Sequence, residues 1–184
     1  CVGGRVAKQQ CVGPLQLPLN NVGVMALDFK STEGIATTVG HAPIAALVDP
    51  VAGSRNAIAE ALSNLVFAPI NKGLAGVSLS ANWMWACNNE GEDARLYEAV
   101  KGCSDFAIEL GINIPTGKDS LSMKQKYPNG ENVIAPGTVI ISAAGNCTDI
   151  NKVVEPVLNK EAGSIYYINL SQDTFKLGGS SFAQ

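Results

Sequence analysis

The chain is organised around the stretch Asn113-Ile-Pro-Thr-Gly-Lys-Asp-Ser-Leu-Ser-Met-Lys124. A helical pattern ends at Gly111 just before it, and the run Gly117 to Ser120 places a bare backbone, a cation, an anion and a hydroxyl in succession. We predict a loop here. Such a loop can meet a phosphate and its magnesium ion together, because glycine lets the backbone approach and lysine supplies the countercharge. The same residues also fit a polar turn whose charges are simply solvated.

Composition defines the class of protein. Of the 184 residues, 46% are hydrophobic and 16% are charged, so the chain can bury a substantial core and is not disordered. The net charge is −3 and the basic residues form no stripe, which argues against a nucleic-acid partner. No apolar run approaches the length of a membrane span, and no signal-peptide layout is present. We therefore expect neither a nucleic-acid nor a membrane partner.

The cysteines indicate the compartment. There are five, widely spread and without a CxxC pair, which argues against a zinc site. An odd number without a framework is typical of free thiols in a reducing compartment. The sequence therefore predicts a cytoplasmic protein.

The two ends suggest a piece of something longer. The sequence starts at Cys1 rather than at Met, and it stops at Gln184 just where a new element is expected. We expect an irregular lead-in over residues 1–20, an α+β domain over 21–172, and the start of a following domain over 173–184.

Hydrophobic periodicity predicts strands mixed with helices. One helix is expected over residues 54–68, with Ser54 as its N-cap, and a second from Glu92 or Asp93 to Gly111. Strands are expected over 22–29, 77–83, 138–144 and 164–170, and a short strand over 35–39 is compatible with the pattern. Residues 44–48 fit either a strand or a helix start, and residues 150–158 fit a short helix or a loop. The order predicts an α/β or α+β protein.

Oxygen-bearing side chains recur on the first predicted helix. Asn56, Glu60 and Asn64 are four residues apart and share one helical stripe. Such a stripe can hold an ion, and it can equally be a solvated helix surface. Hard oxygen donors suit Mg²⁺ that is held jointly by protein and nucleotide phosphates. The candidates in the chain are Glu60, Asn64, Asn21, Asp119 and Asn82.

Several familiar catalytic motifs are absent. The single histidine, His41, lies on a Gly-His-Ala-Pro turn, and its spacing from other residues does not support a serine-type triad. Gly-x-Ser-x-Gly, the Walker A pattern and the dinucleotide fingerprint are all missing. If the chain binds phosphate, it does so by another arrangement.

A set of segments taken together resembles one family. They are Gly13-Pro14-Leu15-Gln16-Leu17-Pro18, Glu60-Ala61-Leu62-Ser63-Asn64, Leu79-Ser80-Ala81-Asn82-Trp83-Met84, Gly91-Glu92-Asp93-Ala94, Gly117 to Lys124, and Leu177-Gly178-Gly179-Ser180-Ser181-Phe182-Ala183-Gln184. In order and approximate spacing they resemble the large, single-chain phosphoribosylformylglycinamidine synthases. The resemblance covers almost the whole chain.

This resemblance implies a fold and an activity. The fold would be the N-terminal domain of the aminoimidazole ribonucleotide synthetase-like superfamily, an α+β mixed sheet packed by helices. The chain would be that subdomain in the second synthetase-like half, and its sheet would pair with the sheet of the first half. The whole enzyme would be an ATP-dependent amidotransferase of purine biosynthesis that converts formylglycinamide ribonucleotide and glutamine into the amidine. Its catalytic histidine and glutaminase cysteine would lie elsewhere, so we expect no catalytic residue here and no activity from this piece alone.

The resemblance also assigns metal and nucleotide contacts. Glu60 and Asn64 match residues that bind Mg²⁺ at an auxiliary nucleotide site. Asn20 falls at a nucleotide contact, and Asn21 stands where the family has a metal-binding aspartate. An amide is a neutral and weaker ligand than a carboxylate, so position 21 departs from the family pattern.

Residues Gly117 to Ser120 match the loop which, in the smaller relatives of the family, contacts nucleotide, metal and substrate. Gly117 and Asn82 would contact nucleotide, while Lys118, Asp119 and Ser120 would contact substrate or phosphate. In those smaller relatives the second residue of the loop is an asparagine. Here it is Lys118, whose charge suits a phosphate better than a metal. The expected cofactors are ATP or ADP and Mg²⁺. The expected partners are the remainder of its own chain (the first synthetase-like half and the glutaminase domain) and a small nucleotide substrate. Alternatives are another ATP-binding synthetase or kinase of the superfamily, or a purely structural nucleotide-holding domain.

Overall fold

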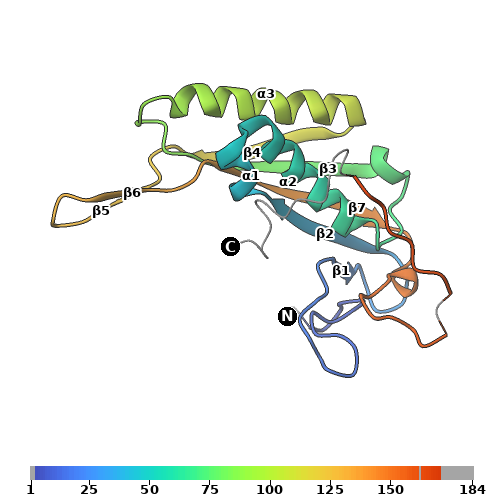
Figure 1. Ribbon diagram of the computed structural model, residues 1–184. Helices are drawn as coiled ribbons and strands as arrows, with labels where there is room; N and C mark the ends of the chain where they lie inside the picture. Colours follow the sequence, from blue (N-terminus) through green and yellow to red (C-terminus); the bar gives the residue numbers. More distant parts are fainter. Residues whose placement is uncertain (1–2, 162, 171–184) are drawn as a thin grey trace.

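A mixed five-stranded sheet forms the body of the protein, with its two long helices on one side (Figure 1). The computed structural model describes residues 3–161 and 163–170. The strand order is β1-β2-β7-β3-β4, with β4 parallel to β3 and the other neighbours antiparallel. The predicted α+β class with a mixed sheet packed by helices is confirmed.

The elements follow one another in this order. The strands are β1 (Gly23–Ala26), β2 (Gly34–His41), β3 (Val77–Met84), β4 (Asn113–Ser120), β5 (Lys124–Lys126), β6 (Asn132–Ile134) and β7 (Thr138–Cys147). The helices are α1 (Pro43–Val48), α2 (Pro50–Leu65) and α3 (Glu92–Leu110), and two 3₁₀ turns are η1 (Gly73–Gly76) and η2 (Ile150–Lys152). No helix within the described residues has the length and apolar character needed to cross a membrane.

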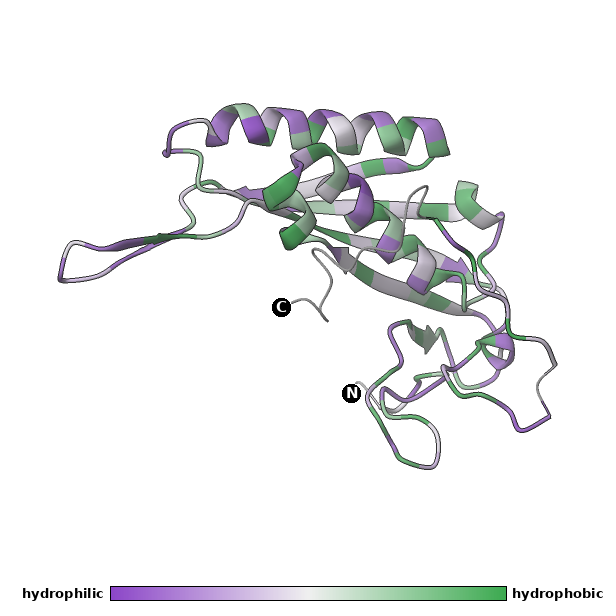
Figure 2. Cartoon of the chain, viewed as in Figure 1, coloured by the Kyte–Doolittle hydropathy of each residue, from purple (hydrophilic) through white to green (hydrophobic). Residues whose placement is uncertain are grey.

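The helices cover one face of the sheet because the strands alternate. In β2, Ala36, Thr38 and Gly40 are buried, and the Thr38 hydroxyl donates to the Ala61 carbonyl of α2 at 2.7 Å. A Cβ atom on Gly40 would collide with the Ala57 carbonyl oxygen, so glycine is what lets α2 lie this close. Figure 2 shows both apolar and polar segments along α2, and its buried residues include Ala57, Ile58 and Ala61. Of the apolar positions that the periodicity assigns to the buried faces of these helices, Ile58, Ala61, Leu65, Ala99, Cys103 and Ala107 are buried, whereas Val66 and Val100 are 72% and 41% exposed.

The other face of the sheet carries the alternate side chains of the same strands. On β2 these are Ile35, Thr37, Val39 and His41, and Val39 is 51% exposed. Because paired residues share a face, the register defines rows across the sheet. One row runs His41, Ile140, Asn82, Lys118 across β2, β7, β3 and β4. We call this surface the open face.

The start of α2 differs from the prediction. The helix begins at Pro50 rather than at Ser54, and Asp49 is the N-cap, with its side chain accepting from the Ala52 amide at 2.9 Å. Proline suits the first helical position because its fixed φ matches and its missing N–H is not needed there. Ser54 is buried inside the helix, where its hydroxyl donates to the Val51 carbonyl at 3.0 Å. Residues 44–48, left open by the pattern, form the helix α1.

The loop predicted over residues 113–124 is wrong for most of its length. Residues Asn113–Ser120 form β4, an edge strand paired with β3. A Cβ on Gly117 would collide with the Ala81 carbonyl of β3, so this glycine serves strand packing. The chain then runs into the β5–β6 hairpin, whose strands are joined by residues 127–131.

The terminal regions differ in outcome. The lead-in over residues 3–20 contains neither helix nor strand, only isolated bridges such as Val6 to Met25. The strand predicted over 164–170 is wrong, since these residues adopt no regular structure. The part of the predicted following domain at 173–184 lies outside the described residues.

Candidate functional site

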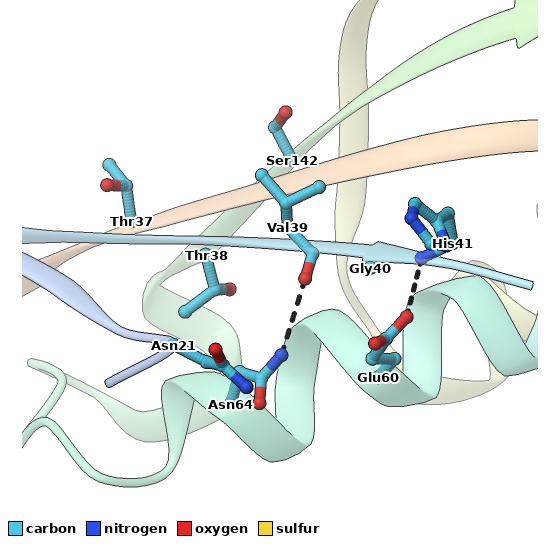
Figure 3. A pocket seen from close by; sticks show the side chains of 9 residues that line it. All are labelled: Asn21, Thr37, Thr38, Val39, Gly40, His41, Glu60, Asn64 and Ser142. Atoms are coloured by element: carbon cyan, nitrogen blue, oxygen red, sulfur yellow. Dashed lines mark hydrogen bonds between the residues drawn. The ribbon is translucent and has the colours of Figure 1, made fainter. Parts of the chain in front are cut away.

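The edge pocket lies where β1 ends and leaves part of β2 unpaired on that side. The last pair of β1 with β2 is Gly23 with Thr37, so residues 38–41 continue alone on this edge. A cavity of about 600 Å³ opens along this free edge, with Thr38, Glu60 and Asn64 on the α2 side of β2 and Thr37, Val39 and Ser142 on the other side (Figure 3). Its lining residues, shown in Figure 3, are Asn21, Thr37, Thr38, Val39, Gly40, His41, Glu60, Asn64 and Ser142.

Two side chains of α2 complete the free edge of β2. Glu60 Oε2 accepts the His41 backbone N–H at 2.7 Å, and Asn64 Nδ2 donates to the Val39 carbonyl at 3.3 Å (Figure 3). Backbone polar groups at an unpaired strand edge need such partners when they are partly enclosed. Each of the two side chains keeps one oxygen that these bonds do not use. The stripe is therefore structural in part and still available to a ligand in part.

The donor set of the edge pocket decides which metal could fit. Within the described residues there is no group of three or more His, Cys, Asp or Glu side chains that could hold a metal ion. The pocket offers one carboxylate, Glu60, and the amide oxygens of Asn21 and Asn64. Mg²⁺ is commonly held by only one or two carboxylates plus substrate phosphates and water. The residues therefore fit an ion shared with a nucleotide, and they do not fit an all-protein cage.

Asn20 lies outside the edge pocket, and its nucleotide contact stays a prediction. Its side-chain amide donates to the Gln9 carbonyl at 3.1 Å, which ties the lead-in segment to the start of β1. It lines a smaller neighbouring cavity of about 140 Å³, together with Asn21 and Asn64. Asn21 and Asn64 thus belong to both cavities.

The strand-end site is the second group of predicted residues, Asn82 with Gly117 to Ser120. Asn82 of β3 is the Cα partner of Lys118 on β4. The Lys118 ammonium donates to the Ser120 hydroxyl at 2.7 Å, as expected for residues two apart on one strand face. Asn82 Oδ1 is buried without a hydrogen-bond partner. A hollow of about 590 Å³ lies beside this edge, lined in part by Trp83, Pro115 and Asp119.

The structure separates the predicted residues into these two sites. β2 and β4 are three strand spacings apart in the sheet, or about 14 Å. Both sites nevertheless lie toward the same end, because His41 and Asn82 flank the same β7 residue, Ile140. Sequence reasoning missed Thr37, His41 and Ser142 as pocket residues. The alternation of residues 35–41 was the only available signal for His41, which ends β2 rather than forming a turn.

One titratable group beside the strand-end site is perturbed. The pKa of the half-buried Cys87 thiol is raised, first by desolvation and then by the carboxylates of Asp93, Glu92 and Asp119. A raised pKa keeps the thiol protonated near neutral pH, so Cys87 is not an activated nucleophile.

Sequence comparisons place the chain among known proteins. The model of the family described as "FGAR-AT PurM_N-like domain" matches residues 1–146. Phosphoribosylformylglycinamidine synthase of Drosophila melanogaster is 46% identical over 188 residues, covering 100% of this chain and 14% of the relative. The Homo sapiens protein of the same name is 45% identical over 185 residues, again covering 100% of this chain and 14% of the relative. A probable chloroplastic/mitochondrial form from Arabidopsis thaliana is 46% identical over 186 residues, covering 100% of this chain and 13% of that relative.

Solved structures share the fold. PurLQS from Thermotoga maritima superposes with a TM-score of 0.60 at 17% identity, covering 84% of this chain and 23% of that chain. T. maritima PurL complexed with ADP gives a TM-score of 0.58 at 18% identity, covering 76% of this chain and 22% of that chain. T. maritima PurL complexed with FGAR gives a TM-score of 0.55 at 19% identity, covering 76% of this chain and 21% of that chain. At these identities the likeness concerns the fold.

The family match and the sheet architecture agree. The matched region contains the whole five-stranded sheet except the last residue of β7, together with all three α-helices. The chain spans about 14% of the length of the curated relatives it matches. The chain belongs to the FGAR-AT PurM_N-like domain family, the family of its phosphoribosylformylglycinamidine synthase relatives.

Proposed function

We propose that this chain is the part of a phosphoribosylformylglycinamidine synthase that supplies an Mg²⁺–nucleotide site and a wall of the substrate site. The whole enzyme would convert formylglycinamide ribonucleotide, glutamine and ATP into the amidine, glutamate, ADP and phosphate. Phosphoryl transfer from ATP would activate the amide oxygen, and ammonia from glutamine would then displace the phosphate. The observation that carries the proposal is that one sheet brings two oxygen- and cation-bearing sites toward the same end, within a family-matched fold.

The edge pocket would hold the nucleotide with its ion. Glu60, Asn64 and Asn21 would supply oxygen ligands, and Mg²⁺ would neutralise the phosphate charge there. Because Glu60 and Asn64 also complete the edge of β2, this nucleotide would stiffen the domain rather than react. The chain would then be part of the synthase and would also hold a structural nucleotide, so these two alternatives are compatible. ADP and ATP complexes of T. maritima PurL support nucleotide binding in proteins of this fold.

The strand-end site would contact the substrate. Lys118 would meet a phosphate group and Ser120 would donate to or accept from the substrate, while Asn82 would contact the nucleotide through its unpaired oxygen. Gly117 would hold β4 against β3, and Asp119, which alternates to the other face of β4, would contact the substrate from the adjoining hollow. These residues bind and orient. The group that takes or gives a proton in the reaction would come from the rest of the protein.

The open face would pack against the remainder of the same protein. It combines exposed apolar side chains (Met25, Ile35, Val39) with polar ones (Thr37, Ser142), as expected for a surface that another sheet covers. The covering partner would be the first synthetase-like half, and a glutaminase domain would supply ammonia. A cytoplasmic location remains a prediction.

Substitutions in the full-length protein test the substrate role. Ser120→Ala and Lys118→Gln should each lower kcat/KM for the formylglycinamide ribonucleotide about tenfold to a hundredfold, because each removes a charge-assisted or substrate hydrogen bond. Glu98→Gln on the exposed side of α3 is the matched control. The 184-residue chain alone should form no amidine. Unchanged kinetics in both variants, or amidine formation by the isolated chain, would contradict the proposal.

A further inference from the structure

The β5–β6 hairpin extends from the strand-end site without a role in the proposed function. It projects away from the body at the end of β4 (Figure 1). β5 and β6 form a separate two-stranded sheet. An isolated two-stranded hairpin is only marginally stable in water. Its position therefore depends on how its base is attached.

Trp85 fixes the base of the hairpin to the site. Its indole is buried, with 1% of the residue exposed. The Trp85 amide donates to the Ser120 carbonyl at 2.9 Å, and the Trp85 carbonyl accepts from Met123 at 3.4 Å. On the other leg of the hairpin, a Cβ on Gly137 would collide with the same indole ring. The first residue of β5, Lys124, is therefore held at a defined place only four residues after Ser120.

Lysines on β5 carry uncompensated charge. Lys124 and Lys126 are two residues apart on one strand face, and their cross-strand partners Ile134 and Asn132 are neutral. Within the described residues, no carboxylate lies at ion-pair distance from either of them or from Lys118. The nearby Glu131 carboxylate instead accepts from the Asn129 side chain at 2.8 Å. Together with Lys118 and the hydroxyls of Ser120 and Ser122, these lysines leave the even-numbered positions from 118 to 126 without a carboxylate.

We propose that Lys124 and Lys126 bind the phosphate group of the ribonucleotide substrate, while Ser120 contacts its reacting end. This inference rests on the proposed function and extends it to the hairpin. Four residues of extended chain span at most about 13 Å, which places β5 within reach of a ligand seated at Ser120. A phosphoribosyl group carries its phosphate several bonds away from the amide, so the two ends of one substrate need two separate contacts. An ammonium binds phosphate as a point charge and needs no rigid geometry.

Edge protection is the competing explanation for these lysines. Charged residues on an exposed strand prevent pairing with other chains. Edge protection requires charged side chains at these positions, but their removal would not change the affinity for the substrate. Ligand affinity therefore separates the two explanations.

The test uses the full-length protein and the double variant Lys124→Gln/Lys126→Gln, with Lys160→Gln as an exposed control. Isothermal titration measures the Kd of the formylglycinamide ribonucleotide and of the same molecule without its phosphate, at one ionic strength. We expect the double variant to raise the Kd of the ribonucleotide about tenfold, leave the dephosphorylated ligand unaffected and leave the KM for ATP unchanged. Lys124→Arg/Lys126→Arg should restore most of the affinity.

The outcomes are distinguishable. An unchanged Kd for the ribonucleotide in the double variant would overturn the inference while leaving the proposed function intact. A raised KM for ATP without a change for the ribonucleotide would mean that the lysines meet the phosphates of the nucleotide, and would also overturn it. A wild-type protein that neither binds nor converts the ribonucleotide would overturn the proposed function and this assignment with it.

Discussion

At the scale of single residues, Gly40 sets the distance between α2 and the sheet, and with it the edge pocket. Any Cβ at this position would collide with the Ala57 carbonyl and the Ala61 amide of α2. We expect Gly40→Ala to destabilise the purified protein by about 1–3 kcal/mol, since overpacking forces the backbone apart. Chemical unfolding measures this. Gly4→Ala, with nothing within 4 Å of its added carbon, is the control and should change stability little. Equal stability of both variants would contradict the close approach.

The buried thiol Cys103 predicts a loss of stability at high pH. Burial raises the pKa of Cys103 to about 11 from 9.0. Below pH 9 the thiol is protonated in both the folded and the unfolded state, so its contribution is fully present. Between pH 9 and 11 only the unfolded state releases the proton, so stability falls, by up to about 1.4 kcal/mol per pH unit.

The measurement compares the pH dependence of unfolding in the wild type and in Cys103→Ala. The variant should show the shallower decline over this window. Cys147, whose pKa is also raised by burial, is present in both proteins and cancels. Parallel curves would mean that Cys103 titrates normally in the folded protein.

Single residues were predictable where one side chain carried the signal. Gly111 ends α3 with a left-handed φ of 69°, as its position after the helical pattern indicated. The i, i+4 stripe on α2 identified Glu60 and Asn64 as a pair. Their bonds to β2 could not be predicted, because those depend on where β1 stops pairing. For the same reason His41 was assigned to a turn.

At the scale of elements, Asp49 joins two helices. Its backbone amide donates to the Ala45 carbonyl at the end of α1, and its carboxylate caps α2. Asp49→Ala should lower the free energy of unfolding by about 1 kcal/mol through loss of the cap. Asp49→Asn should retain most of the stability, because asparagine caps equally well. Thermal or chemical unfolding decides, and a fully stable Asp49→Ala variant would rule out the capping role.

Elements with a strong hydrophobic periodicity were predictable from the sequence. Strands that form only because they pair with a neighbouring strand were not. The helices α2 and α3 follow from apolar spacing, although Asp49-Pro50 moved the start of α2 forward. β4 was mistaken for a loop, since Pro115, Gly117 and Asp119 are poor strand formers. Pairing with β3 overrides that preference. Residues 164–170 illustrate the converse, because β-compatible residues without a paired neighbour form no strand.

At the scale of the whole molecule, the open face predicts a dependence on the rest of the protein. Ile35 lies on this face and is 38% exposed in the chain. If the remaining protein covers the face, Ile35→Lys should destabilise the full-length protein by at least about 3 kcal/mol, because it buries an unpaired charge. Tyr97→Lys, on an exposed position of α3, is the control. A full-length protein that tolerates Ile35→Lys as well as Tyr97→Lys would contradict the packing.

The central claim is that Glu60 binds an ion with its nucleotide in addition to completing the edge of β2. Glu60→Gln separates these roles, because glutamine keeps an oxygen for the His41 amide and removes the charge. The decisive measurement is Mg²⁺-dependent ADP binding by the full-length protein, alongside its thermal unfolding and the Glu98→Gln control. The account predicts at least about a tenfold weaker affinity for ADP with an unchanged fold. Unchanged ADP affinity in Glu60→Gln would contradict it.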